Sequence, residues 1–190
     1  MRLGVRFGMR VRGYYIRVLL LLMMMVLWAG MPGVSYVLAQ DSIGLIIAID
    51  SKDSAAVREQ LESGIDPDDA FVPEGLAFAG ASALHVAVLN NNTEIVSILL
   101  EDGANINIKA RDPFHGTPLD WAAYWGIEEM VVLLVQNGAD VNSKTILGTT
   151  PLDSTWVENP FVSPDDRMQF SKNRALIRAF LASQGGRSGK

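Results

Sequence analysis

Apolar and polar residues alternate along the chain with the period of short amphipathic helices. An apolar stripe with spacing i, i+1, i+4 runs through residues 95–100, and a second one runs through residues 130–134. A helix with such a stripe must be covered by a neighbour to be stable. The pattern therefore predicts short helices that pack side by side.

A glycine-led segment recurs after these apolar stripes. Gly-Ala-Asn-Ile-Asn at 103–107 returns as Gly-Ala-Asp-Val-Asn at 138–142, and a weaker copy, Gly-Ile-Asp-Pro-Asp, stands at 64–68. Glycine suits the left-handed residue that ends many helices, and asparagine and aspartate favour the turn that follows. Each copy thus predicts the end of a helix and the start of a projecting loop.

A second recurring segment predicts a helix start. Ser-Ala-Leu-His-Val-Ala at 82–87 is followed by Thr-Pro-Leu-Asp-Trp-Ala at 117–122 and by Thr-Pro-Leu-Asp-Ser-Thr at 150–155, at spacings of 35 and 33 residues. Serine or threonine can cap a helix, and proline fits its first turn. The repeating unit is therefore helix, turn, helix and loop.

Together these segments resemble the ankyrin repeat, whose period is about 33 residues with the signature T-P-L-H-x-A. The resemblance covers roughly residues 42–185 and implies an all-α solenoid of about four helix-turn-helix repeats with finger loops. We expect repeats at about 42–69, 80–111, 112–144 and 145–185, then a disordered tail at 186–190. Extra residues at 69–80 and an insertion at 158–171, before a helix at 172–183, depart from the period.

The first 39 residues differ in character from the rest. They contain five arginines and no acidic residue, an apolar run at 18–28, and Val-Leu-Ala at 37–39. This order is typical of a signal peptide, with cleavage expected after Ala39. We therefore expect an exported protein, periplasmic or secreted. The alternative is an uncleaved inner-membrane anchor at 16–38 with the repeats outside, because the arginines resist translocation.

Charge narrows the range of partners. Without the N-terminal segment the chain keeps 11 basic and 21 acidic residues, a net charge of −10. Nucleic acids and anionic membrane surfaces are disfavoured, so membrane contact is expected only through an uncleaved N-terminal segment. The remaining class of partner is a protein, and the negative net charge favours one with a basic surface. The chain has no cysteine, so packing alone must hold the domain together.

The residues available for chemistry are few. No nucleophile motif, phosphate-binding loop or metal-ligand spacing is present, so we expect no catalytic residue, no metal and no cofactor. The resemblance implies that His85 links neighbouring fingers. His115 and Asp112 share a finger, but two ligands do not make a metal site.

The resemblance further implies partner binding through a concave face made by the fingers and the first helices. By register, the predicted contact residues are Phe114, His115, Tyr124, Trp125, Leu89, Asn90, Ile146 and Leu147. We expect Trp121 and Trp156 to fill space between repeats, because aromatic residues at helical spacing are most often core residues.

The function predicted is a non-enzymatic, monomeric protein–protein adaptor in the cell envelope. One alternative is an immunity or protective protein for an exported factor. The other is a hydrolytic or metal-dependent accessory enzyme that uses Asp112, His115 and the insertions. That enzyme would need a pocket with convergent ionisable groups.

Overall fold

The computed structural model describes residues 35–189, with side chains from residue 42. Residues 1–36 and 37–190 are separate units, and the second contains the repeats. Eight helices occur in the described residues: α2 (Ser35–Asp50), α3 (Ser54–Glu62), α4 (Ala83–Leu89), α5 (Thr93–Glu101), α6 (Pro118–Trp125), α7 (Glu128–Gln136), α8 (Pro151–Ser154) and α9 (Arg167–Ser183). The predicted signal segment lies outside the described residues, except that 35–39 belong to α2.

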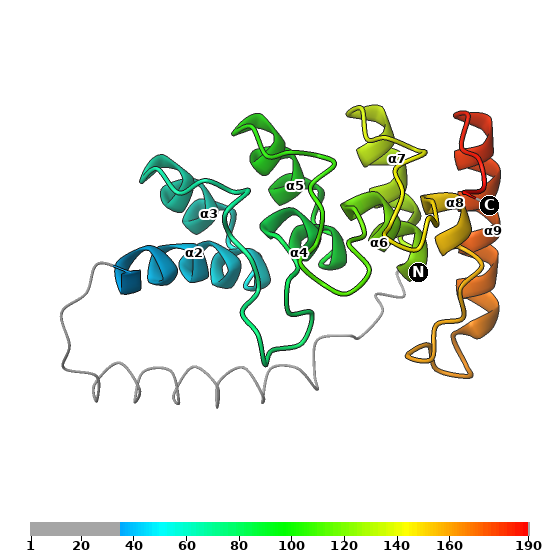
Figure 1. Cartoon of the computed structure of the whole chain (residues 1–190), viewed down its shortest axis with the longest axis horizontal. Coiled ribbons are helices and arrows are strands. Elements are labelled where there is room, and N and C mark those ends of the chain that lie inside the picture. Colours follow the sequence, from blue (N-terminus) through cyan, green and yellow to red (C-terminus); the bar gives the residue numbers. More distant parts are fainter. Residues whose placement is uncertain (1–34, 190) are drawn as a thin grey trace. The chain divides into compact units, whose positions relative to one another are not determined.

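The helices form four pairs, each packed on the next. The helices contact each other within a pair, as α4 contacts α5, and first helices contact first helices, as α4 contacts α6. Second helices do the same, since α3 contacts α5 and α7 contacts α9. Figure 1 shows the pairs in succession, with a finger loop between one pair and the next. The predicted all-α solenoid of four helix-turn-helix repeats is thereby confirmed.

One continuous apolar core runs through the stack. Its largest fully buried side chains are contributed by every pair and include Leu45, Leu99, Leu119, Leu134 and Ile177. No pair could cover both of its faces alone, so burial between neighbours stabilises the whole array. Within residues 35–189 no helix combines the length and apolar character needed to cross a bilayer.

Reciprocal caps begin the first helices of pairs two to four. Ser82 caps α4 with His85, Thr117 caps α6 with Asp120, and Thr150 caps α8 with Asp153. In each case the N-cap hydroxyl accepts from a backbone N–H, and the side chain three residues later accepts in return. Such capping boxes satisfy donors that a helix start leaves unpaired.

Hydrogen bonds between fingers repeat along the stack. Asp68 Oδ1 accepts from Asn105 N at 2.9 Å, and Asn107 Oδ1 accepts from Asp140 N at 2.8 Å. Asn142 Oδ1 accepts from Arg187 N at 2.8 Å, which continues the same series. Residue 187 therefore stands where residues 105 and 140 stand in earlier repeats.

The expected disordered tail is thus wrong for residues 186–189. The C-terminal Gly-Gly-Arg-Ser-Gly takes the place of the glycine-led turn of a repeat. Asp153 accepts from Ser188 Oγ at 2.7 Å and from Gly189 N at 2.8 Å, and Thr150 Oγ1 donates to Arg187 O at 2.8 Å. These bonds replace water around the backbone groups of the last turn and fix the segment.

The insertion is also shorter than predicted. Helix α9 begins at Arg167, five residues before the expected Lys172, so only residues 158–166 form a loop. Ser163 Oγ donates to Asp166 Oδ2 at 2.7 Å, just before the first turn. The two proline residues of the insertion lie before this point, so nothing prevents helix formation from Arg167 onward.

Candidate functional site

Five aromatic side chains gather around the C-terminal end of α6. We call Phe78, Trp121, Tyr124, Trp125 and Phe161 the aromatic cluster. The Trp125 ring centroid lies 6.0 Å from that of Phe78, 6.0 Å from that of Phe161 and 5.5 Å from that of Tyr124. Trp121 lies 6.1 Å from Phe78. Tilted and offset ring pairs at these distances attract one another.

The extra residues between the first and second pairs bring Phe78 to the cluster. They form a short hairpin in which Val72 N donates to Ala81 O at 2.8 Å and Gly80 N donates to Val72 O at 2.9 Å. Arg111 N of the next finger donates to Gly80 O at 2.7 Å. A Cβ at position 80 would lie 2.6 Å from the carbonyl carbon of Arg111, so this approach requires glycine.

Phe78 itself has a left-handed backbone, with φ of 61°. For a bulky residue this conformation costs about 1–2 kcal/mol, which glycine does not incur. We expect Phe78→Gly to be more stable than Phe78→Ala by about 1 kcal/mol, because both lose the ring and only glycine relieves the backbone. Urea unfolding of the two variants measures the difference.

Position 161, which has no positive φ, supplies the matched control. There the order should reverse, with Phe161→Ala more stable than Phe161→Gly. Equal stability of the two variants at position 78 would contradict a strained backbone.

The second insertion brings Phe161 to the cluster from the other side. Asn159 is buried and its Oδ1 accepts from Phe161 N at 3.0 Å. Arg174 of α9 is also buried, and its guanidinium donates to Ser154 O at 2.8 Å and Val157 O at 2.6 Å. The start of the insertion is therefore anchored, while the Phe161 side chain remains 71% exposed.

The predicted finger residues form a second exposed group. Ile146 N donates to Phe114 O at 3.1 Å, which joins the finger between α5 and α6 to the finger between α7 and α8. Asp112 Oδ1 accepts from His115 N at 2.7 Å and from Phe114 N at 3.1 Å, so it shapes the turn. The side chains of Phe114, His115, Ile146 and Leu147 are exposed. We call these four residues the finger tips.

The remaining predicted contact residues are partly buried. Tyr124 and Trp125 end α6 inside the aromatic cluster, and burial raises the pKa of the Tyr124 phenol, an effect that the nearby Arg174 opposes. Leu89 and Asn90 end α4. Asn90 Nδ2 donates to Ile49 O at 3.2 Å, which ties the second pair to the first. Asn90 therefore has a structural contact, whether or not it meets a partner.

His85 lies under the cluster, fully buried, with its ring centroid 4.9 Å from that of Trp121. Nε2 lies 3.2 Å from Gly116 O, a carbonyl that can only accept, so Nε2 carries the proton. Nδ1 then accepts from Ser82 Oγ at 2.8 Å. Burial lowers the pKa of His85 to about 4, although the bond to Gly116 opposes this shift. His85 is a neutral link between fingers.

At the equivalent position in the third pair stands Asp120, which is also buried. Burial raises the pKa of this carboxyl, and the hydrogen bonds from the Thr117 backbone and hydroxyl only partly offset the effect. Both groups are held by their own helix caps. Neither residue lines the pocket at the fourth pair.

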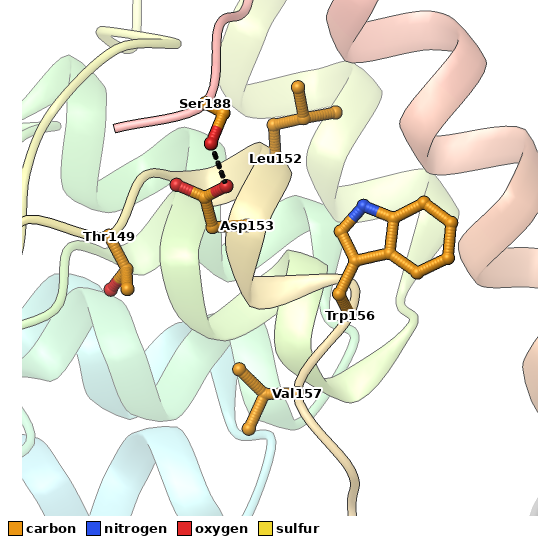
Figure 2. Close-up of a pocket in the computed structure, with 6 residues that line it drawn as sticks. All are labelled: Thr149, Leu152, Asp153, Trp156, Val157 and Ser188. Atoms are coloured by element: carbon orange, nitrogen blue, oxygen red, sulfur yellow. Dashed lines mark hydrogen bonds between the residues drawn. The ribbon is translucent and has the colours of Figure 1, made fainter. Parts of the chain in front are cut away.

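An open pocket of about 450 Å³ lies at the fourth pair, lined by Thr149, Leu152, Asp153, Trp156, Val157 and Ser188 (Figure 2). Asp153 is its one ionisable lining residue. Burial alone would raise the pKa of Asp153, but hydrogen bonds from Gly189 N, Thr150 and Ser188 lower it to about 2. Both carboxylate oxygens already accept hydrogen bonds, so this pocket offers no acid–base pair.

The alternative of a metal-dependent enzyme finds no geometric support in the described residues. Between residues 42 and 189 no group of three His, Asp or Glu side chains could hold a metal ion. The Asp112 carboxylate accepts from the backbone of His115 rather than from its ring. No pair of a nucleophile and a base is formed there.

Sequence reasoning missed Phe78 and Phe161 as members of the site. Both stand in segments longer than the repeat period, and an aromatic residue in such a segment was the available signal. The expectation that Trp156 fills space between repeats is wrong, since it is 70% exposed. It lines the open pocket instead, and the Arg178 guanidinium lies 3.9 Å from its ring centroid.

Comparison with known protein families assigns this chain to one of them. A family profile described as Ankyrin repeats (3 copies) matches residues 45–145, which is more than half of the chain. The match begins in α2 and ends in the finger between α7 and α8, and it includes α6 and the finger before it.

Individual relatives match a shorter stretch. Mouse protein phosphatase 1 regulatory subunit 12A is 40% identical over 77 residues, 40% of this chain and 7% of that protein. The rice BTB/POZ domain and ankyrin repeat-containing protein NPR5 is 46% identical over 81 residues, 42% of this chain and 16% of that protein. The Arabidopsis thaliana regulatory protein NPR5 is 43% identical over 81 residues, with the same coverage. The aligned stretch is less than a fifth of each relative.

Proposed function

We propose, since the chain belongs to the ankyrin-repeat family, that it is an adaptor that binds a protein through the aromatic cluster and the finger tips. Ankyrin repeats are protein-interaction scaffolds. One of the relatives is named a regulatory subunit, and another is named for a BTB/POZ domain beside its ankyrin repeats. Fold alone does not give the surface that binds. The exposed side chains indicate which surface binds.

The observation that carries this proposal is an exposed aromatic surface assembled by two separate insertions. Phe161, in the second insertion, is 71% exposed and Phe78, in the first, is 37% exposed, and Phe114 on a finger is 57% exposed. Aromatic side chains supply large contact area at low entropic cost and dominate binding hot spots. Both insertions are additions to the regular repeat, and each exposes an aromatic ring. Contact with a partner is the best explanation for such additions.

We further propose that the adaptor acts outside the cytoplasmic membrane, as the basic and apolar N-terminal segment suggests. The partner is then a protein of the cell envelope or the exterior. The net charge of −10 after residue 39 favours one with a basic surface. An unfused, full-length chain expressed with its own N-terminal segment tests the location by fractionation and by the mass of the mature protein.

The binding proposal is tested by crosslinking and affinity capture from the envelope fraction. We expect a specific partner to be captured by the wild-type protein and lost with Phe114→Ala, Phe161→Ala. The matched control replaces two exposed apolar residues of α9, Met168→Ala and Leu176→Ala, which are 85% and 46% exposed. Circular dichroism checks that both variants are folded. Capture lost equally with the control would refute a specific role for the aromatic surface.

A further inference from the structure

The charges around the aromatic cluster define a partner chemistry. We propose, resting on the proposed function, that the cluster binds an extended, arginine-containing segment of another protein. Its guanidinium groups would stack on Phe78 and Phe161 while the neighbouring carboxylates balance their charge.

Both insertion loops that carry these rings contain acidic residues and no basic residue. Residues 69–80, which include Phe78, contain Asp69 and Glu74 and no basic residue. Residues 157–166, which include Phe161, contain Glu158, Asp165 and Asp166 and no basic residue. Glu74, Glu158 and Asp165 are exposed. Two independent insertions thus pair an exposed ring with negative charge only, which is complementary to a cation.

The chain already stacks arginines on aromatic rings of the same segments. The Arg111 guanidinium lies 3.7 Å from the ring centroid of Phe71, in the first insertion. That of Arg178 lies 3.9 Å from the ring centroid of Trp156, just before the second insertion. Among residues 42–189 no cation lies over Phe78 or Phe161. Those two rings are therefore available to a guanidinium from a partner, whose flat face suits stacking better than an ammonium.

The two rings are close enough to be reached by one extended segment. Each lies 6.0 Å from Trp125, so their centroids are at most about 12 Å apart. An extended chain advances ~3.3 Å per residue, and two arginines about two to four residues apart would span this distance. In a folded basic domain, by contrast, the two arginines could come from positions far apart in the sequence. The geometry therefore favours a short linear segment with two nearby arginines.

Four basic side chains of the finger between α5 and α6 and of α9 are already engaged within the fold. Arg111 and Arg178 are stacked on Phe71 and Trp156. Arg174 is buried and bound to two carbonyl groups. Lys109 Nζ donates to Ser143 Oγ at 2.7 Å and to Lys144 O at 2.9 Å. These four basic side chains are thus held by contacts within the fold.

The test measures binding of fluorescein-labelled Gly-Ser peptides by anisotropy with the full repeat-containing chain. The probe carries two arginines three residues apart, and a second peptide replaces both by citrulline, which keeps the shape and removes the charge. We expect the citrulline peptide to bind on the order of tenfold more weakly, given the usual strength of cation–π contacts. A peptide with a single arginine should bind more weakly than the probe with two.

Matched variants assign the effect to the cluster. Glu74→Gln, Glu158→Gln, Asp165→Asn should weaken the arginine peptide severalfold, and Phe78→Gly, Phe161→Ala should abolish the preference for arginine over citrulline. The control removes three exposed carboxylates of the second helices, Glu59→Gln, Glu94→Gln, Glu101→Gln, and should leave the affinity unchanged. It carries the same change in net charge as the first variant.

The outcomes are separable from those of the capture experiment. Equal binding of arginine and citrulline peptides, equal weakening by the control variant, or no binding at millimolar peptide would each overturn the arginine assignment. If a partner is nevertheless captured through Phe114 and Phe161, the adaptor function stands and only its chemistry is wrong. If arginine binding is found but no partner is captured from the envelope, the chemistry stands and the proposed setting fails.

Discussion

Acidification from pH 7 to pH 4 is expected to lower the free energy of unfolding by about 3 kcal/mol through His85 alone. The pKa of His85 is about 4 in the folded chain and about 6.5 when the chain is unfolded. Above pH 6.5 neither state is protonated and the stabilisation is complete. As the pH falls, the unfolded chain binds a proton that the folded chain excludes, and stability is lost progressively between pH 6.5 and 4.

The physical cause is the single tautomer that this site accepts. Protonated Nδ1 could no longer accept from Ser82 Oγ, and the charged ring would lie in the core below Trp121. Urea unfolding at pH 7, 6, 5 and 4 measures the effect as a slope. Asp120, with a raised pKa, works in the opposite sense, because its contribution is greatest at low pH and is lost as the pH rises.

Two variants isolate the His85 contribution. His85→Asn is expected to be less stable at pH 7, because its link to Gly116 O is lost, but to lose about 3 kcal/mol less between pH 6.5 and 4. The other histidine of the chain supplies the control, since His115 is exposed on a finger and His115→Gln should keep the wild-type slope. The contribution of Asp120 is common to all three proteins. An unchanged slope in His85→Asn would show that another group causes the pH dependence.

Leu99→Ala is expected to destabilise the chain by about 3 kcal/mol, within the range of 2–5 kcal/mol found for buried leucines. Leu99 is fully buried in α5, which packs against α3 and within its own pair against α4. The substitution removes apolar burial and leaves a cavity in the middle of the array. Because repeats are stabilised by their neighbours, the loss weakens the contacts of α5 with α4 and with α3 of the preceding pair.

Chemical denaturation of Leu99→Ala and of Leu176→Ala checks this expectation. Leu176 is 46% exposed on α9, so its truncation should cost less than about 1 kcal/mol. Similar losses in both variants would mean that the array does not depend on a central core. Hydrogen exchange would then locate the part of the stack that opens first.

Much of the fold was predictable because its signals are local. A cap and its partner three residues later, a glycine that ends a helix, and a stripe of apolar residues all act within one or two turns of chain. The pairs Thr117–Asp120 and Thr150–Asp153 form capping boxes in the positions that the repeated segment indicated. The apolar residues of 95–100 and 130–134 face the core as their spacing required.

Other features could not be read from the sequence because they depend on segments far apart in the chain. The Gly-Gly-Arg-Ser-Gly of the tail has the composition of a flexible segment, yet Asn142 and Asp153 hold it in the place of a finger. Trp156 stands at helical spacing but lines an open pocket. The start of α9 depended on where the insertion ended, which no periodicity marks.

The sequence by itself determined the repeat, its caps, its all-helical class and the exposed finger residues, because each follows from the conformational preferences of neighbouring residues. Only the tertiary structure decided that Phe78 and Phe161 meet at Trp125, because two loops separated by more than 80 residues converge only after the pairs have stacked. The candidate site is a product of that stacking. The sequence of a loop says little about the path that the loop takes in space. The stacked repeats fix the two ends of each loop and thereby its path.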